Sequence, residues 1–346
     1  MKALLALAKT ANTRSKGEHA VRPRHLFIIV SAFLAVLVLS DAAFAQTWPM
    51  KPITIVVPYP PGGGIDPVAR LISQKLSERL KQQFLVDNKP GASGMIGAAY
   101  VAHSAPDGYT LMISQMAEIV INQHLVKNMT YSPENDLTPV TLVVKLPFIL
   151  AAHPSMPFKT VEELVAYARK NPGKLSYSSS GPGSAQHLAG EMLKHMAGIN
   201  MVHIPYKGVA PAISDMIGGQ VQLGFAGLPT VLPHVQSGKL LGLGVSSKTR
   251  ASAAPNIPPI AEVAGLGEFE LIQWMGMFVA AKTPTAIVQK LQQEVATVLR
   301  LPDIKERLLA QGNEPVGNSS AEFADFVKAE RAKVGRIVRE SNITAD

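Results

Sequence analysis

The chain has 346 residues, carries a formal charge of +8 and contains no cysteine. Disulfide bonds and thiolate metal sites are therefore excluded, and the basic residues form no cluster that would indicate a nucleic-acid-binding surface. With 47% hydrophobic residues the chain has enough apolar material to build its cores, and its length predicts two domains after an N-terminal signal.

Residues 1–45 have the pattern of an export signal. Six basic residues precede the apolar segment Leu26–Ser40, which is shorter than the roughly 20 residues of a comfortable membrane span. Ala43-Phe44-Ala45 places small residues at both cleavage-recognition positions, which predicts cleavage before Gln46 and an exported mature protein of charge about +4. The alternative is an uncleaved N-terminal anchor.

The stretch Ile53–Arg70, ITIVVPYPPGGGIDPVAR, predicts a strand, a glycine loop and a helix start. The apolar run Ile53–Val57 is typical of a buried strand. Asp66-Pro67 predicts Asp66 as the helix N-cap and Pro67 as the first helical residue. Backbone N–H groups at such a helix start favour an anion. The glycines are contiguous and no lysine follows them, so neither nucleotide-binding motif fits. The alternative is a tight turn without a ligand.

Strands and helices alternate along the remaining chain, which predicts parallel βαβ units and an α/β fold. Further strands are expected at Phe84–Val86, Tyr109–Ser114, Leu175–Ser178, Met201–Ile204, Val221–Phe225 and Leu240–Val245. A helix is expected at Gln115–Leu125, and capping boxes at Thr160 with Glu163 and at Ser319 with Glu322 start two others.

Two long apolar runs, Val140–Ala152 and Leu271–Ala281, suit strands that cross between two domains. They predict a first lobe made of residues 46–148 and 273–346, and a second lobe made of residues 149–272. In the second lobe, the loop Ser179–Ser184 repeats the order of strand, glycine loop and helix start. If both loops face one cleft, two helix N-termini converge on a small anionic ligand.

Seven stretches, in this order, resemble the solute-binding receptors of tripartite tricarboxylate transporters, the Bug-type periplasmic binding proteins. They are PITIVVPYPPGGGIDPVARL, NKPGASGMIGA, SAPDGYTL, NPGKLSYSSSGPGSAQHLAGE, VHIPYKGVAPAISDMIGGQVQLGF, LPHVQSGKL and TPTAIVQKL. They cover nearly all of the chain after the signal. The resemblance implies a type II periplasmic-binding-protein fold, with two doubly wound α/β lobes around an interlobe cleft.

The resemblance also implies a function and a site. A small, often carboxylate-bearing solute would bind between the lobes, which close over it and present a surface to membrane transporter subunits. The positions carried over as ligand-proximal are Tyr59, Pro61, Gly62, Gly63, Ser178, Gly181, Gly183 and Ser184, with Ser180 from the same loop and Asp66 as the helix cap. His187 follows the second loop and is a further candidate for the cleft.

The chain departs from the family pattern at three places. Ile65 stands at the mouth of the anion loop, where a hydroxyl residue is usual, Gln115-Met116-Ala117-Glu118 replaces small hydroxyl residues, and Ala226-Gly227 replaces Asp-Asn. Ile65, Gln115, Glu118 and Ala226 are therefore further candidate ligand-binding residues. If Glu118 faces the cleft, a ligand with an amine or amide donor is favoured. The alternative places Glu118 in solvent at a helix start, where the dipole favours a carboxylate.

No cofactor, metal or catalytic site is predicted. The histidines form no H-E-x-x-H motif and the serines no G-x-S-x-G elbow, so the leading interpretation is a receptor and not an enzyme. Two alternatives remain open from the sequence: a sensory partner of a membrane kinase, and an exported enzyme acting on a small anionic substrate.

Overall fold

The computed structural model describes residues 48–62, 64–341 and 343. The predicted signal peptide and its cleavage site before Gln46 lie outside the described residues, as does Gly63. The fold below is that of the compact unit Pro49–Asp346. Within the described ranges, no helix combines the length and the apolar character needed to cross a membrane.

Ten strands form one mixed sheet in the order β2-β1-β3-β9-β4-β7-β5-β6, with β8 and β10 also paired to β4. Their bounds are β1 Ile53–Val57, β2 Phe84–Asn88, β3 Thr110–Gln115, β4 Leu137–Ala152, β5 Leu175–Ser179, β6 Met201–Pro205, β7 Leu223–Gly227, β8 Leu241–Val245, β9 Ile272–Ala280 and β10 Glu314–Pro315. Two parallel groups, β2-β1-β3 and β7-β5-β6, confirm the predicted βαβ units. Strand β8 is separated from β7 by β4, to which both pair antiparallel.

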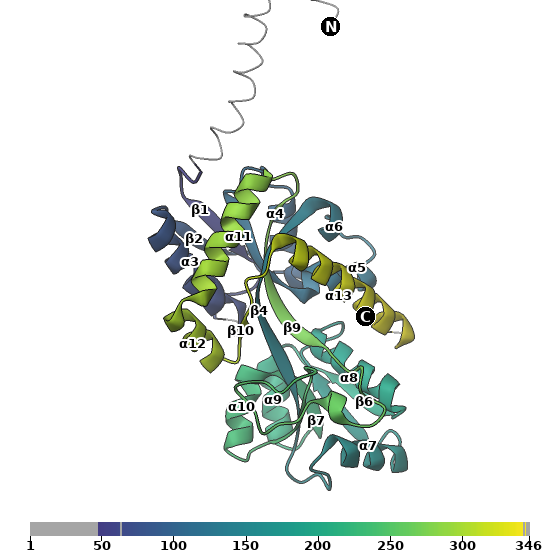
Figure 1. The fold of residues 1–346 in the computed structure, drawn as a ribbon. Helices are drawn as coiled ribbons and strands as arrows, with labels where there is room; N and C mark the ends of the chain where they lie inside the picture. The colour runs from purple at the N-terminus through teal and green to yellow at the C-terminus, as the bar shows by residue number, and fades with distance from the viewer. Residues whose placement is uncertain (1–47, 63, 342, 344–346) are drawn as a thin grey trace, which may run out of the picture. The chain divides into compact units, whose positions relative to one another are not determined.

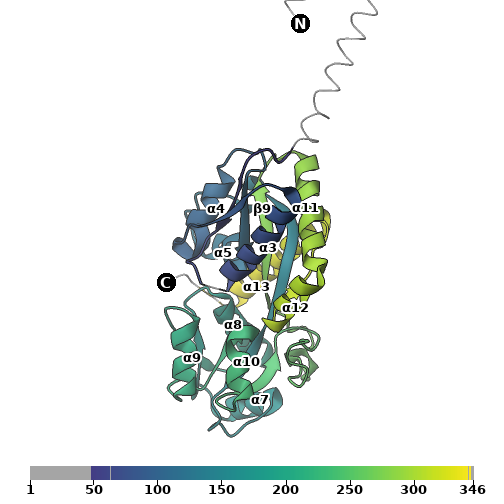
Figure 2. The same ribbon diagram turned by 90° about the vertical axis from the view of Figure 1, so that its left-hand side faces the viewer.

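Helices cover both faces of each parallel group. Their bounds are α3 Ile65–Leu80, α4 Met95–Ala102, α5 Asn122–Leu125, α6 Pro133–Asp136, α7 Val161–Lys170, α8 Ala185–Ala197, α9 Val209–Ile217, α10 Leu228–Gln236, α11 Thr285–Arg300, α12 Pro302–Ala310 and α13 Ser320–Glu340. In Figure 2, α4 and α11 lie on opposite sides of β9. Ser319 with Glu322 forms the predicted capping box. At Thr160 only half of the predicted box is present: Thr160 accepts from the Glu163 amide, but the Glu163 carboxylate accepts from the Lys159 amide instead of the Thr160 amide.

Strands β4 and β9 are the two predicted crossing strands, and they lie side by side through the middle of Figure 1. The first part of β4 pairs with β9 up to Pro147, and Phe148–Ala152 then pairs with β7 and β8. Pro147 lies inside this continuous strand. A proline is tolerated there because the ladder changes partners at this residue, so the missing N–H donor breaks no continuous row of bonds.

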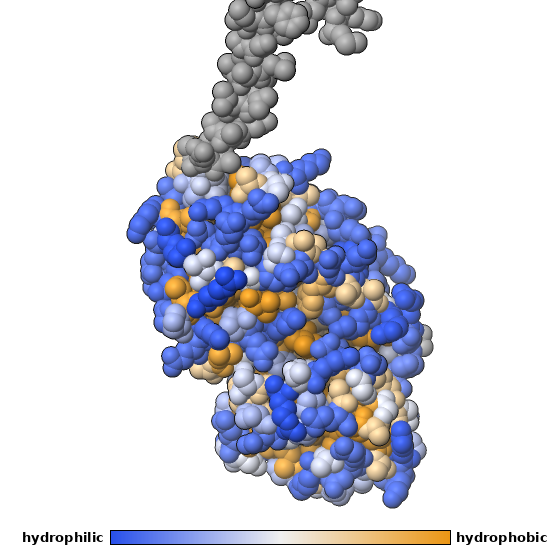
Figure 3. All heavy atoms as spheres, in the orientation of Figure 1, coloured by the Kyte–Doolittle hydropathy of each residue, from blue (hydrophilic) through white to orange (hydrophobic). Residues whose placement is uncertain are grey.

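The core runs through both strand groups and along the crossing strands. Trp274 of β9 is fully buried, and its ring contacts Phe323 and Phe326 of α13 edge-on. Trp274 is therefore a packing residue. At the surface, apolar residues form patches among a majority of polar ones on the face seen in Figure 3.

Candidate functional site

The loop after β1 is held by Asp66. Its Oδ2 accepts from the Gly62 amide at 3.2 Å and from Arg70 Nε at 3.0 Å, and its Oδ1 accepts from Asn88 Nδ2 at 3.0 Å. The expectation that Asp66 is the N-cap was wrong, because Gly64 already has helical dihedral angles and α3 begins at Ile65. Asp66 therefore lies in the first turn of the helix, where its carboxylate ties the glycine loop to the end of β2.

These contacts lower the pKa of the Asp66 carboxyl, mainly through the hydrogen bond from Arg70 and against the opposing effect of burial. Since the folded pKa lies below the ordinary 3.8, the stabilisation is present above that value and is lost as the pH falls through the folded pKa. Asn88 was not predicted as a site residue. Its position at the carboxyl end of the strand beside β1 was the available signal.

We expect Asp66→Asn to lower the free energy of unfolding by about 1–3 kcal/mol at pH 7, because an amide cannot accept from all three donors. Urea unfolding measures this difference, which should shrink as the pH falls from 3.8 through the lowered pKa of the wild-type carboxyl. Asp325→Asn, at an exposed position of α13, is the control and should change little. Equal stability of wild type and Asp66→Asn at pH 7 would contradict the assignment.

Glu118 is fully buried in the π-helical segment Ala117–Ile121. Its Oε1 accepts from Ser114 Oγ at 2.6 Å and from the Gln115 amide at 2.9 Å, and its Oε2 accepts from the Tyr59 hydroxyl at 2.7 Å. The alternative of a solvated Glu118 was wrong, since the strand β3 continues to Gln115 and turns the next residues inward. That Glu118 contacts a ligand stays a prediction. A donor group of the ligand would have to share a carboxylate oxygen of Glu118 with Tyr59, Ser114 or the Gln115 amide.

Burial raises the pKa of Glu118, while the hydrogen bonds from Ser114, the Gln115 amide and Tyr59 oppose that shift. Burial and the neighbouring Glu118 carboxyl likewise raise the pKa of Tyr59, so its hydroxyl stays protonated and donates. Gln115 also receives a hydrogen bond from Gln273 of β9. Gln273 was missed by sequence reasoning, because only the pairing of β3 with β9 brings the two glutamines together.

The second loop joins β5 to α8 and is closed by its own side chains. The Gly181 amide donates to Ser179 Oγ at 3.1 Å, and the Gly183 amide donates to His187 Nδ1 at 3.1 Å. Ser184 is the N-cap of α8, its hydroxyl accepting from the His187 amide. The backbone amides of Gly181 and Gly183, which were expected to bind a ligand, therefore already donate to acceptors within the loop.

Other predicted positions in this loop are also engaged. Ser180 donates to Gln186 Oε1 at 2.9 Å, and Ser178 is buried within β5. His187 is buried rather than open to a cleft, because its ring stacks on that of His203. Gln186 and His203 were not predicted, and the register of β5 and β6 that places His203 is not readable from the sequence.

Two of the departures from the family pattern lie in the core. Ile65 is 3% exposed and Ala226 is 2% exposed, the latter within an apolar cluster on β4, β7 and the neighbouring helices. The side chain of Ile65 therefore packs inside and does not line the mouth of the loop, which corrects that expectation. At Ala226 the side chain serves packing, which leaves only the backbone for a ligand contact. Pro61, by contrast, is exposed.

The second loop lies against Leu125, at the end of α5. A Cβ built on Gly183, which has φ +68°, would lie 2.5 Å from Leu125 Cδ1. Leu125 follows the segment that carries Glu118, and Asn122 of the same helix donates to the Ser93 carbonyl. The loop of the second strand group thus lies directly against the helical segment of the first.

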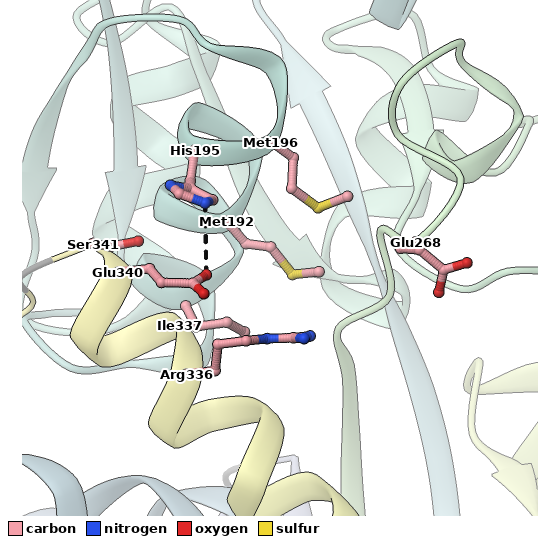
Figure 4. Close-up of a pocket in the computed structure, with 8 residues that line it drawn as sticks. All are labelled: Met192, His195, Met196, Glu268, Arg336, Ile337, Glu340 and Ser341. Atoms are coloured by element: carbon pink, nitrogen blue, oxygen red, sulfur yellow. Dashed lines mark ion pairs between the residues drawn. The ribbon is translucent and has the colours of Figure 1, made fainter.

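A separate cavity of about 210 Å³ lies between α8 and the C-terminal end of α13. Met192, His195, Met196, Glu268, Arg336, Ile337, Glu340 and Ser341 line it. His195 Nε2 lies 3.5 Å from Glu340 Oε2, as the dashed line in Figure 4 marks. Since His195 is roughly 16 Å along α8 from the N-cap Ser184, this cavity is distinct from the two loops.

Titratable groups do not converge in a way that indicates a bound metal. Within the described part of the chain, no three side chains among His, Cys, Asp and Glu gather as metal ligands would.

The arrangement of two glycine-containing loops, each at the start of a helix and both at the carboxyl ends of parallel strands, suits the binding of a small anion.

Comparison with known proteins decides the family. The model of the tripartite tricarboxylate transporter family receptor matches residues 68–343. The chain belongs to this receptor family. Protein BugT of Bordetella pertussis is 32% identical over 317 residues, which are 91% of this chain and 97% of BugT.

Solved structures agree with the receptor assignment. An R. palustris protein with adipate has a TM-score of 0.77 and 36% identity, and the match covers 86% of this receptor and 99% of that chain. MatC from Rhodopseudomonas palustris with bound malate has a TM-score of 0.72 and 30% identity, with 84% and 100% covered. The receptor therefore has the type II periplasmic-binding-protein fold, and its family is one of solute receptors, not enzymes.

Proposed function

We propose that this receptor captures a small organic acid in the periplasm between two lobes, made of residues 46–148 with 273–346 and of residues 149–272. The carboxylate would lie against the loop Tyr59–Asp66, and the loop Ser178–Ser184 would close on it from the other side. The approach of Gly183 to Leu125 carries this proposal, because Leu125 ends the helical segment whose Glu118 binds Tyr59 of the first loop. The adipate and malate bound to the two R. palustris relatives support the ligand class.

The ligand would be held by backbone groups and dipoles more than by a cation. Arg70, the basic side chain that contacts Asp66 below the first loop, is already bound to Asp66 and Asn88. An anion at this place would rely on the start of α3 and the start of α8. We propose further that the closed receptor delivers the solute to the membrane subunits of a tripartite tricarboxylate transporter, after removal of the signal before Gln46.

A thermal-shift screen tests the ligand class. The mature protein, unfolded and refolded to remove any carried-over solute, is heated with adipate, malate, citrate, their amides and amino-acid analogues. A ligand at 100 times its Kd adds about 2.7 kcal/mol of stability, which corresponds to a rise in Tm of several degrees. Mass spectrometry then checks that the stabilising compound is recovered unchanged.

We expect at least one carboxylate to stabilise the protein and its diamide not to. Stabilisation by the amides alone would contradict the proposed ligand class, and consumption of the compound would contradict a receptor. Preference for an amino acid over the matching simple acid would instead support the prediction that Glu118 favours a donor-bearing ligand.

A further inference from the structure

Two histidine rings are stacked beneath the second loop. His187 of α8 and His203 of β6 have ring centroids 3.8 Å apart and an interplanar angle of 7°. Tyr177 of β5 continues the stack, with its centroid 5.0 Å from that of His203. His187 is 9% exposed and Tyr177 fully buried, so packing on both sides fixes the orientation of the rings.

Each histidine holds a different part of the loop. His203 Nε2 lies 2.6 Å from Ser179 Oγ, the atom that accepts the Gly181 amide at 3.1 Å. His187 Nδ1 accepts the Gly183 amide at 3.1 Å. Both glycines have positive φ, +133° at Gly181 and +68° at Gly183, so the two bends that require glycine are those that the histidines hold.

The hydrogen bond from Gly183 requires that His187 Nδ1 carry no proton. Nε2 then carries the proton of the neutral ring, and it faces Glu191 Oε1 at 3.9 Å. Protonation of Nδ1 would leave the Gly183 amide without its acceptor. It would also place positive charge against the face of the second imidazole.

The charged and titratable groups around the pair come from β5, β6 and α8. They are Tyr177, Glu191 and Lys194, with Glu191 also accepting from Tyr177 at 2.6 Å and from Lys194 at 2.7 Å. Burial lowers the pKa of His187, and burial together with His187 lowers the pKa of His203 to about 4. Both rings are therefore neutral near pH 7.

We infer that His187 and His203 are positioning residues: as a neutral stacked pair they hold the Ser179–Ser184 loop in its ligand-binding shape, and their protonation releases it. The inference rests on the proposed function, in which this loop closes on the solute. Affinity should therefore fall as the pH drops from about 6.5 towards 4, the interval between the ordinary histidine pKa and that of His203.

Two kinds of variant separate the hydrogen bonds from the stacking. His187→Phe and His203→Phe keep a ring in the stack but remove the nitrogen, and we expect each to weaken adipate or malate binding about tenfold. His187→Asn and His203→Gln keep an acceptor near the same place but cannot be protonated. They should bind within about threefold of wild type at pH 7.5, and their Kd should change less on acidification.

Calorimetry from pH 7.5 to 4.5 gives the Kd of wild type and of each variant. Protonation of the ligand itself changes both Kd values equally, so it does not affect their ratio. His103→Gln, an exposed histidine after α4, is the control and should follow wild type throughout. A ratio that does not change with pH, together with full affinity in both phenylalanine variants, would overturn the inference.

Hydrogen exchange of the Gly181 and Gly183 amides tests the same inference without a ligand. His187→Phe should speed exchange at Gly183 and His203→Phe at Gly181, each at least tenfold, with little change in the other strands of the sheet. If adipate and malate fail to bind wild type, the proposed ligand fails while this readout still decides the role of the histidines. Unchanged exchange in both variants would overturn that role.

Discussion

Replacing Glu118 by alanine is expected to lower the free energy of unfolding by about 3–5 kcal/mol. The change leaves the hydroxyls of Tyr59 and Ser114 and the Gln115 amide without their acceptor, in a place that water does not reach. Removing an acceptor from buried donors costs more than the hydrogen bonds themselves contribute, because each donor has already lost its hydration. Urea or thermal unfolding measures the loss.

Glu118→Gln is the matched variant and should cost less than about 1.5 kcal/mol, since it keeps one oxygen for Ser114 and the Gln115 amide. Burial raises the folded pKa of Glu118 above the ordinary 4.5, so the folded protein holds this proton more tightly than the unfolded chain does. Wild-type stability therefore declines as the pH rises from 4.5 through the folded pKa. The glutamine variant should gain relative to wild type over that interval, and an alanine variant as stable as the glutamine variant would contradict the role of Glu118.

Gly183→Val is expected to weaken ligand binding at least tenfold and to cost about 1–2 kcal/mol of stability. The stability loss arises because φ is +68° at this position, a conformation that side chains other than glycine disfavour. The affinity loss has a separate cause, since the new Cβ would lie 2.5 Å from Leu125 Cδ1 and hold the second loop away from α5. Calorimetry with adipate or malate measures the affinity.

Gly198→Val is the control for backbone strain alone. It follows the other end of α8 with φ +61°, and no heavy atom lies within 4 Å of a Cβ built there. It should lose similar stability but keep its affinity. Leu125→Ala combined with Gly183→Val should recover part of the binding, and equal affinity losses in the Gly183 and Gly198 variants would contradict the loop contact.

Much of the fold could be predicted from local pattern. Apolar runs in the sequence predicted β1 and the two long strands β4 and β9. Serine and glycine residues predicted the loop before α8. The error at Asp66 shows the limit of such patterns. Asp-Pro is a common helix start, but Gly64 already has helical dihedral angles. The Asp66 carboxylate therefore does not cap the helix and accepts from the Gly62 amide of the loop instead.

Alternation of apolar segments, turn residues and capping pairs therefore determined the secondary structure and the α/β class, because those signals act between residues close in the chain, and the seven family-like stretches indicated the receptor family. The tertiary structure alone decided which side chains meet. Strand register placed His203 under the second loop, the pairing of β3 with β9 joined Gln115 to Gln273, and burial converted Glu118 from an exposed helix residue into the acceptor for Tyr59. Register and burial depend on contacts distant in sequence, whose energies no local pattern contains.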